Sequence, residues 1–365
     1  MARIPINEPG PFGMIADRRI PVTLVSGFLG SGKTTIIRRL LATPAFANAA
    51  VIVNEFGDID FNQIAFAQSD AEIISANSGC FCCTARARIG EAFDALNSRA
   101  QSHGPLEQVL VETSGLSAPA PILQAIINDP QIVAKYQLSG LITLVDSITG
   151  LDALNERREA REQISFAGAI VLSKADLAYD RDVTVLRSAI AEINPLASIF
   201  ESHDGGVDLQ RLCTAAGDYA PAGPPSNGAG RTGEHGSGGH GSGEGAVRAW
   251  TITRAMPATR TGLTLWMDLM AAYRGSEVLR MKGIVNVEGR PVAVESVRHV
   301  FHPPLDLGPW PDDDRRTRVV VIASGIERKS IDEAFDALCF QPLAKPLDRQ
   351  AYKRFQKIMS RMQSR

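Results

Sequence analysis

The sequence lacks a run of about 18 or more apolar residues, the length that predicts a membrane-spanning helix. It also lacks an excess of charge of either sign, since 38 basic and 40 acidic residues leave a formal net charge of -2. A protein that binds nucleic acid or an anionic membrane usually carries a basic surface, which this balance does not predict. We therefore expect neither nucleic acid nor a membrane as a partner.

Cysteine is scarce, with five residues in 365, and no apolar core of a secretory signal occupies the first twenty positions. Cys213 and Cys339 stand alone, whereas Cys80, Cys82 and Cys83 lie almost side by side. Neighbouring cysteines are too closely spaced for an ordinary disulfide framework. We expect a cytoplasmic protein with reduced thiols, and the cluster predicts metal or redox chemistry.

The first half of the chain alternates short apolar runs with amphipathic stretches. The apolar runs show no polar alternation, which is typical of strands buried on both faces of a parallel sheet; they occupy residues 21–26, 50–54, 108–112, 140–146 and 169–173. Helical periodicity occupies the intervening residues 34–42, 89–100 and 151–165. This order predicts an α/β domain with a doubly wound, mostly parallel sheet.

Composition divides the rest of the chain. Residues 220–245 are mostly glycine, proline and serine, which predicts a flexible linker. Beyond it, residues 278–287 and 290–300 predict a hairpin that turns at Glu288-Gly289, within a small α+β domain. We expect an N-terminal extension at 1–19, a P-loop domain at 20–219, the linker, a C-terminal domain at 246–340 and a basic tail at 341–365.

A phosphate-binding motif follows the first predicted strand. Glycines let backbone N–H groups converge on phosphate oxygens, and the following helix adds its positive N-terminal dipole. Lys33 is expected to reach the β- and γ-phosphates, and the Thr34 hydroxyl to bind Mg²⁺. The motif matches GxxxxGK[ST] and consists of Gly27, Phe28, Leu29, Gly30, Ser31, Gly32, Lys33 and Thr34.

Two later strands end in polar residues that suit the same reaction. Glu112 ends a buried strand and is followed by Gly115, as in a Walker B element, where the acid orients the Mg²⁺ shell and the glycine senses the γ-phosphate. Further on, Lys174 and Asp176 belong to an SKxD sequence at the place where GTPases carry NKxD. Asp176 supplies the acceptor pair for guanine, so GTP is favoured over ATP, although Ser173 replaces the usual asparagine.

The cluster Cys80, Cys82 and Cys83 lies between the two phosphate motifs, where a switch region is expected. Thiolates favour Zn²⁺ and other borderline or soft metals, and three of them supply most of a tetrahedral shell. Cys82 and Cys83 project differently from the backbone, which leaves open whether both bind the metal.

Together these motifs resemble the CobW-like GTPases, within the wider class of metal-handling GTPases. The resemblance rests on 27–34, 54–57, 79–83, 112–116 and 173–176, and extends to 280–284 and 300–302 in the C-terminal region. It implies a metallochaperone or insertase that hydrolyses GTP to GDP and delivers zinc, or else cobalt or iron, to a client metalloenzyme. GTPases of this class often pair, so a homodimer is also expected.

The resemblance assigns site residues by position. It implies that the nucleotide phosphates and Mg²⁺ are bound by Gly30, Gly32, Lys33, Thr34 and Thr35. The Walker B role falls to Glu112, the guanine-binding role to Lys174 and Asp176, and the transition metal to Cys80, Cys82 and Cys83. Glu55 lies in the switch segment and is a candidate for positioning water or contacting metal.

Two other functions remain open. A metal-buffering or metal-sensing protein would use the nucleotide only for regulation. A small-molecule kinase would also need the phosphate motif, but neither the CxCC nor the SKxD sequence.

Overall fold

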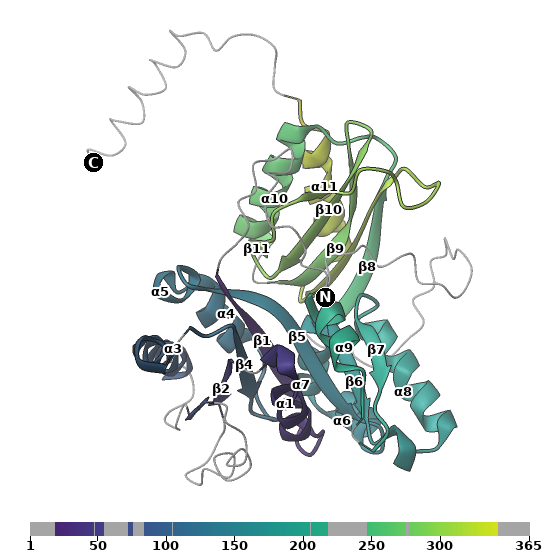
Figure 1. Cartoon of the computed structure of the whole chain (residues 1–365). Helices are drawn as coiled ribbons and strands as arrows, with labels where there is room; N and C mark the ends of the chain where they lie inside the picture. Colours follow the sequence, from purple (N-terminus) through teal and green to yellow (C-terminus); the bar gives the residue numbers. More distant parts are fainter. Residues whose placement is uncertain are drawn as a thin grey trace, which may run out of the picture.

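The computed structural model describes residues 19–46, 48–54, 72–75, 84–103, 105–204, 206–217, 247–274 and 277–341. The predicted positions Glu55, Cys80, Cys82 and Cys83 lie outside these ranges. The described residues form a larger α/β domain and a smaller domain built on a second sheet (Figure 1).

The larger domain contains a seven-stranded sheet in the order β3-β2-β4-β1-β5-β6-β7, and every pairing in it is parallel. Its strands are β1 (Ile20–Gly27), β2 (Ala49–Asn54), β3 (Glu72–Ser75), β4 (Gln108–Thr113), β5 (Tyr136–Asp146), β6 (Ala169–Ser173) and β7 (Ser198–Glu201). β2, β3 and β4 lie on one side of β1, and β5, β6 and β7 lie on the other. β1 therefore lies at the topological switch point, where open α/β sheets bind ligands.

Helices cover both faces of this sheet, which confirms the doubly wound fold. One face packs against α1 (Lys33–Leu41) and α9 (Leu209–Gly217). The opposite face packs against α3 (Thr84–His103), α4 (Ala120–Asn128), α5 (Pro130–Val133), α6 (Gly150–Glu156), α7 (Arg158–Phe166) and α8 (Asp180–Ile193). The central strands carry apolar side chains on both faces and are therefore buried throughout, as their uninterrupted Val, Ile and Leu content predicts.

In the larger domain, three details differ from the sequence prediction. The helix predicted at 151–165 is two helices, because Arg157 adopts an extended conformation (φ -119°, ψ 119°) between α6 and α7. The strands β3 and β7 were not predicted. Each has four residues and lies at an edge of the sheet, where a short strand leaves little periodic signal.

The smaller domain is an antiparallel sheet with strand order β11-β10-β9-β13-β8, and β12 pairs with β10. Its elements are β8 (Val247–Arg254), α10 (Arg260–Arg274), β9 (Val278–Val287), β10 (Arg290–Val297), β11 (Val300–Phe301), β12 (Leu305–Asp306), β13 (Thr317–Ser324) and α11 (Arg328–Phe335). The predicted β9–β10 turn is confirmed, with Glu288 at φ 53° and Gly289 at φ 90°. Two positive φ values are typical of a tight hairpin turn.

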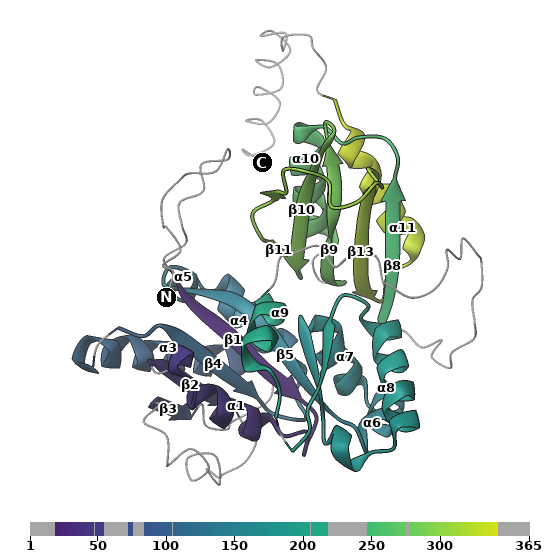
Figure 2. The same ribbon diagram turned by 45° about the vertical axis from the view of Figure 1, so that its right-hand side comes forward.

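Both faces of the second sheet are covered. One packs against α10 and α11 around Trp266 and Phe335, whose ring centroids lie 4.9 Å apart. From the other face, Leu279, Val297 and Ile322 join the same apolar core as the α7 and α8 side chains of the larger domain. Figure 2 shows the second sheet standing over the larger domain, with β8 close to α8. Among the described residues, no helix is both long and apolar enough to cross a membrane.

The boundary between the domains contains a largely buried histidine. Burial lowers the pKa of His302 below its ordinary value of 6.5; nearby Glu295 opposes this shift, and Arg280 and Arg19 add to it. The folded protein therefore holds His302 neutral at pH values where the unfolded chain takes up a proton. Its contribution to stability is present above pH 6.5 and is lost as the pH falls below that value.

We predict that His302→Gln makes the free energy of unfolding less dependent on pH below about 6.5. The slope of the free energy of unfolding against pH should fall by an amount that corresponds to at most one proton taken up on unfolding. Urea unfolding at a series of pH values measures this slope. His203→Gln, which makes the same substitution at an exposed histidine, is the control for the chemical change itself. An unchanged slope in His302→Gln would contradict the assignment.

Candidate functional site

Four loops meet at one edge of the large sheet. They follow β1, β4, β5 and β6, and because these strands are parallel, their carboxyl ends lie together. Together with the last residues of these strands, the loops carry, in this order, the phosphate motif, Gly115, Asp146 and the SKxD sequence. Motifs that are distant in sequence therefore share one site.

The phosphate loop is held in a conformation that its glycines permit. Gly27 and Gly32 have φ values of 143° and 91°, which L side chains rarely adopt. A Cβ at Gly27 would lie 2.4 Å from the carbonyl oxygen of Leu144, so the loop packs directly on β5. Gly32 caps α1, and the N-terminus of that helix faces the loop, as anion binding requires.

Lys33 lies over this loop. Its Nζ donates to the carbonyl oxygens of Gly27 at 2.9 Å and Phe28 at 3.2 Å. The ammonium group therefore stands at the mouth of the backbone cradle. Of the remaining predicted loop residues, Ser31 is buried and Thr35 is exposed on α1.

Thr34 and Glu112 form the predicted Mg²⁺ pair. The Thr34 hydroxyl donates to Glu112 Oε1 at 3.2 Å, and Glu112 is only 5% exposed. A hydroxyl and a carboxylate at this distance provide the hard oxygen ligands that Mg²⁺ prefers, so the residues fit the ion. When bound, Mg²⁺ neutralises charge on the nucleotide phosphates.

The loop after Glu112 lies against the phosphate loop. A Cβ at Gly115 would lie 2.8 Å from both the backbone nitrogen and Cδ2 of Leu29. The two loops therefore touch at a position where only glycine fits. At the base of this contact, Thr113 Oγ1 donates to Ser26 Oγ at 3.0 Å and joins β4 to β1.

The residues predicted to bind the base follow directly after β6. Lys174 has φ 56°, and its Nζ forms an ion pair of 2.5 Å with Asp146 Oδ2. Asp176 is exposed, and its Oδ1 accepts from the Asp204 backbone N–H at 3.3 Å. Ser173 is buried and donates to the Val145 carbonyl at 3.3 Å, so its hydroxyl is engaged within the sheet.

Sequence reasoning missed Asp146 and Asp204. Asp146 ends a buried strand in the same way as Glu112, so the same signal was available for it. Asp204 lies in a loop without a motif and meets Asp176 across 28 positions of sequence.

The predicted metal ligands are not among the described residues, but their neighbours are. β2 ends at Asn54, immediately before Glu55, and pairs with β4 so that Asn54 lies opposite Thr113. α3 begins at Thr84, immediately after Cys83. The described ranges contain no group of three His, Cys, Asp or Glu residues able to hold a metal. Burial raises the pKa of the Cys213 thiol to about 11, which disfavours the thiolate that a metal requires.

The cradle, the Thr34–Glu112 pair and the doubly wound sheet define a nucleotide-binding protein of the P-loop class. A family profile described as the CobW/HypB/UreG nucleotide-binding domain matches residues 21–201. A second, described as the cobalamin synthesis protein cobW C-terminal domain, matches residues 247–339. The chain belongs to the CobW/HypB/UreG family and carries its nucleotide-binding domain followed by a CobW C-terminal domain.

Individual relatives agree with this assignment. The zinc chaperone YjiA of Escherichia coli is 26% identical over 322 residues, which cover 87% of this chain and 98% of the relative. The zinc chaperone CobW of Pseudomonas aeruginosa is 28% identical, with coverage of 86% and 90%. The crystal structure of Zn(II)-bound YjiA GTPase from E. coli has the same fold, with a TM-score of 0.64 at 22% identity and coverage of 88% and 99%.

We predict that Asp176→Asn weakens GTP binding by about 100-fold, because an amide replaces one charged acceptor by a donor. Binding of xanthosine triphosphate should improve, since xanthine presents a carbonyl where guanine presents its amino group. Isothermal titration with both nucleotides measures the exchange. Asp180→Asn, at an exposed carboxylate on α8, is the control. Unchanged GTP affinity in Asp176→Asn would rule out this carboxylate as the base-binding group.

Proposed function

We propose that this chain is a GTP-hydrolysing metallochaperone that binds a transition metal at Cys80, Cys82 and Cys83 and delivers it to a client protein. Zinc is the favoured metal, since the relatives in E. coli and P. aeruginosa are named zinc chaperones; cobalt and iron are the alternatives. The observation that best supports GTP hydrolysis is the Thr34–Glu112 hydrogen bond beside Lys33.

The residues around the phosphate loop have the following proposed roles. Lys33 and the backbone N–H groups of the loop containing Gly27, Gly30, Ser31 and Gly32 bind the phosphates, with Thr35 beside them. Thr34 and Glu112 hold Mg²⁺, and Gly115 senses the γ-phosphate from its position against Leu29. Lys174 and Asp176 bind guanine, and Glu55 positions water or contacts metal.

Gating of the metal is supported by chain connectivity. Residues 55–83 begin at the end of β2, next to β4 and its Glu112, and finish at the start of α3. A segment tied to the site in this way would respond to the γ-phosphate, and hydrolysis would then change the geometry of the thiolates and release the metal.

A homodimer across this edge is the proposed assembly. Leu29, Leu116 and Ile148 belong to loops around the nucleotide site and are each more than half exposed, at 52%, 51% and 55%. Apolar side chains on neighbouring loops suit a partner surface. We propose a cytoplasmic protein whose partners are proteins, with no nucleic acid or membrane among them.

We propose five segments: an extension at 1–19, a GTPase domain at 20–219, a linker at 220–245, a CobW-type domain at 246–340 and a tail at 341–365. Both described sheets fall within the two domain ranges.

Zinc affinity should differ between the protein loaded with a non-hydrolysable GTP analogue and the protein loaded with GDP, by a factor of about 5 to 150. Competition with a chromogenic chelator measures both values. Lys33→Ala should keep zinc binding but lose the nucleotide effect, and the exposed-lysine variant Lys329→Ala is its control. Equal zinc affinities in the two nucleotide states would refute gating.

Two assays separate the alternatives. Selectivity for GTP over ATP without any phosphorylated acceptor argues against a kinase. Multiple turnovers of GTP in the presence of a client apo-protein exclude a buffering or sensing protein with a purely regulatory nucleotide.

A further inference from the structure

Gln163 lies on α7, outside every motif in the sequence, and yet it is only 1% exposed. Its Nε2 donates to the carbonyl oxygens of Gly115 at 3.2 Å and of Ser117 at 3.0 Å. Both acceptors belong to the loop that follows Glu112. A buried amide that donates both of its hydrogen bonds to one loop fixes the position of that loop.

The donor is itself held in place. Thr143 Oγ1 on β5 donates to the Gln163 backbone carbonyl at 2.9 Å. Within the loop, the Ser117 backbone N–H donates to Ser114 O at 3.1 Å and closes a turn around Gly115. Gln163 therefore connects this turn, which also touches Leu29, to the rigid centre of the sheet.

The same helix is bound by the C-terminal domain at its last residue. Arg280 Nη1 on β9 donates to the Phe166 carbonyl at 3.0 Å, and Arg280 Nη2 pairs with Glu295 Oε1 at 2.6 Å. Both partners of this ion pair are buried, with side chains 4% and 9% exposed. The Arg298 guanidinium lies 5.3 Å from the centroid of the Phe166 ring.

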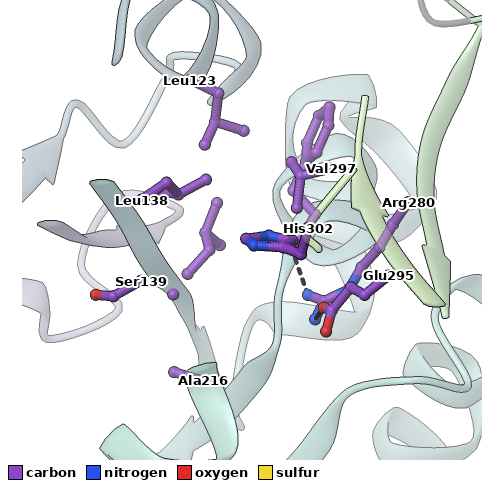
Figure 3. A pocket seen from close by; sticks show the side chains of 11 residues that line it. Leu123, Leu138, Ser139, Ala216, Arg280, Glu295, Val297 and His302 are labelled. Carbon is purple, nitrogen blue, oxygen red and sulfur yellow. Dashed lines mark hydrogen bonds and ion pairs between the residues drawn. The ribbon is translucent and has the colours of Figure 1, made fainter. Parts of the chain in front are cut away.

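Figure 3 shows the surroundings of this contact. Arg280, Glu295 and His302 from the C-terminal domain lie on one side of a small cavity of about 20 Å³, and Leu138 and Ser139 from β5 lie on the other. A buried ion pair is costly to break on one side, because the remaining charge loses its partner. Because Arg280 also donates to the Phe166 carbonyl, movement of the end of α7 should carry the Arg280–Glu295 pair with it.

We propose that Gln163 is a positioning residue for GTP hydrolysis and that α7 connects the loop at 115–117 to the C-terminal domain. Gln163 and Phe166 are three residues apart, within one helical turn. A shift of the loop between nucleotide states then reaches Arg280 through less than a turn of rigid helix. This inference rests on the γ-phosphate-sensing role proposed for Gly115.

The first test is Gln163→Met in the full-length chain, which removes both donors at nearly constant side-chain volume. The kcat for GTP should fall about tenfold, because removal of the two hydrogen bonds costs the transition state about one net hydrogen bond more than it costs the bound nucleotide. Affinity for a non-hydrolysable GTP analogue should weaken by a similar factor. GDP affinity should stay within about twofold, because the role proposed for the loop at 115–117 is contact with the γ-phosphate, which GDP lacks.

The matched control is Asn194→Leu. Asn194 is also fully buried, and its Nδ2 donates two hydrogen bonds to the end of the same helix, at Ile164 O and Ala167 O. The hydrogen bonds of its side chain go to Ile164, Ala167 and Leu196 and not to the loop at 115–117, so this variant should lower the melting temperature while it changes the affinities for the GTP analogue and GDP equally. If Gln163→Met does not fold, Gln163→Asn, which keeps the donor with a shorter reach, takes its place. Unchanged kcat and analogue affinity in the folded variant would overturn the positioning role.

The second test measures hydrogen exchange across β9 with GDP and with the GTP analogue. Wild-type protein should show a difference in exchange between the two nucleotides, and Gln163→Met should lose it. A difference that persists unaltered in the variant would overturn the connection through α7. If the wild-type protein shows the same affinity and the same hydrogen exchange with the analogue and with GDP, the role of Gly115 as a γ-phosphate sensor is contradicted.

Discussion

The Thr34 hydroxyl and the Glu112 carboxylate lie 3.2 Å apart, and this contact depends on the parallel pairing of β1 with β4. In this register Val25 of β1 lies opposite Glu112 of β4. The end of β4 therefore lies beside the phosphate loop that follows β1. Because β5 and β6 are parallel to them, Asp146, Lys174 and Asp176 emerge at the same edge. The chemistry of the site is thus a consequence of strand direction before it is a consequence of any single side chain.

The loops at this edge are packed against one another as well as against the sheet. Gly27 lies on β5, and Gly115 lies on Leu29, each with no room for a Cβ. Gln163 binds the second of these loops from behind, and Phe166, one turn further along α7, binds Arg280 of the C-terminal domain. A nucleotide-dependent change at Gly115 therefore has a continuous set of buried polar contacts through which it can act on the smaller domain.

Sequence patterns predicted the parts that depend on local chemistry. The phosphate loop, the Walker B strand and the hairpin at Glu288 each have a motif or a turn signal, and the structure has them at the predicted places. The break at Arg157 was missed because α6 and α7 continue one helical periodicity on either side of a single extended residue. The contacts of Gln163 with Gly115 and of Arg280 with Phe166 were not predicted, because these partners lie 48 and 114 positions apart and no local sequence pattern indicates such a pairing.

The central claim is that the nucleotide and the metal are coupled through the edge of the large sheet. Linkage requires that zinc change the affinity for the GTP analogue by the same factor by which the analogue changes the affinity for zinc. The direct measurement is titration of the analogue and of GDP, with and without saturating zinc, in wild-type protein and in the triple variant Cys80→Ser, Cys82→Ser, Cys83→Ser. We predict that zinc shifts the affinity for the analogue, that it leaves GDP affinity unchanged, and that the triple variant shows neither effect. An analogue affinity that is independent of zinc, or a zinc effect that survives in the triple variant, would contradict this account.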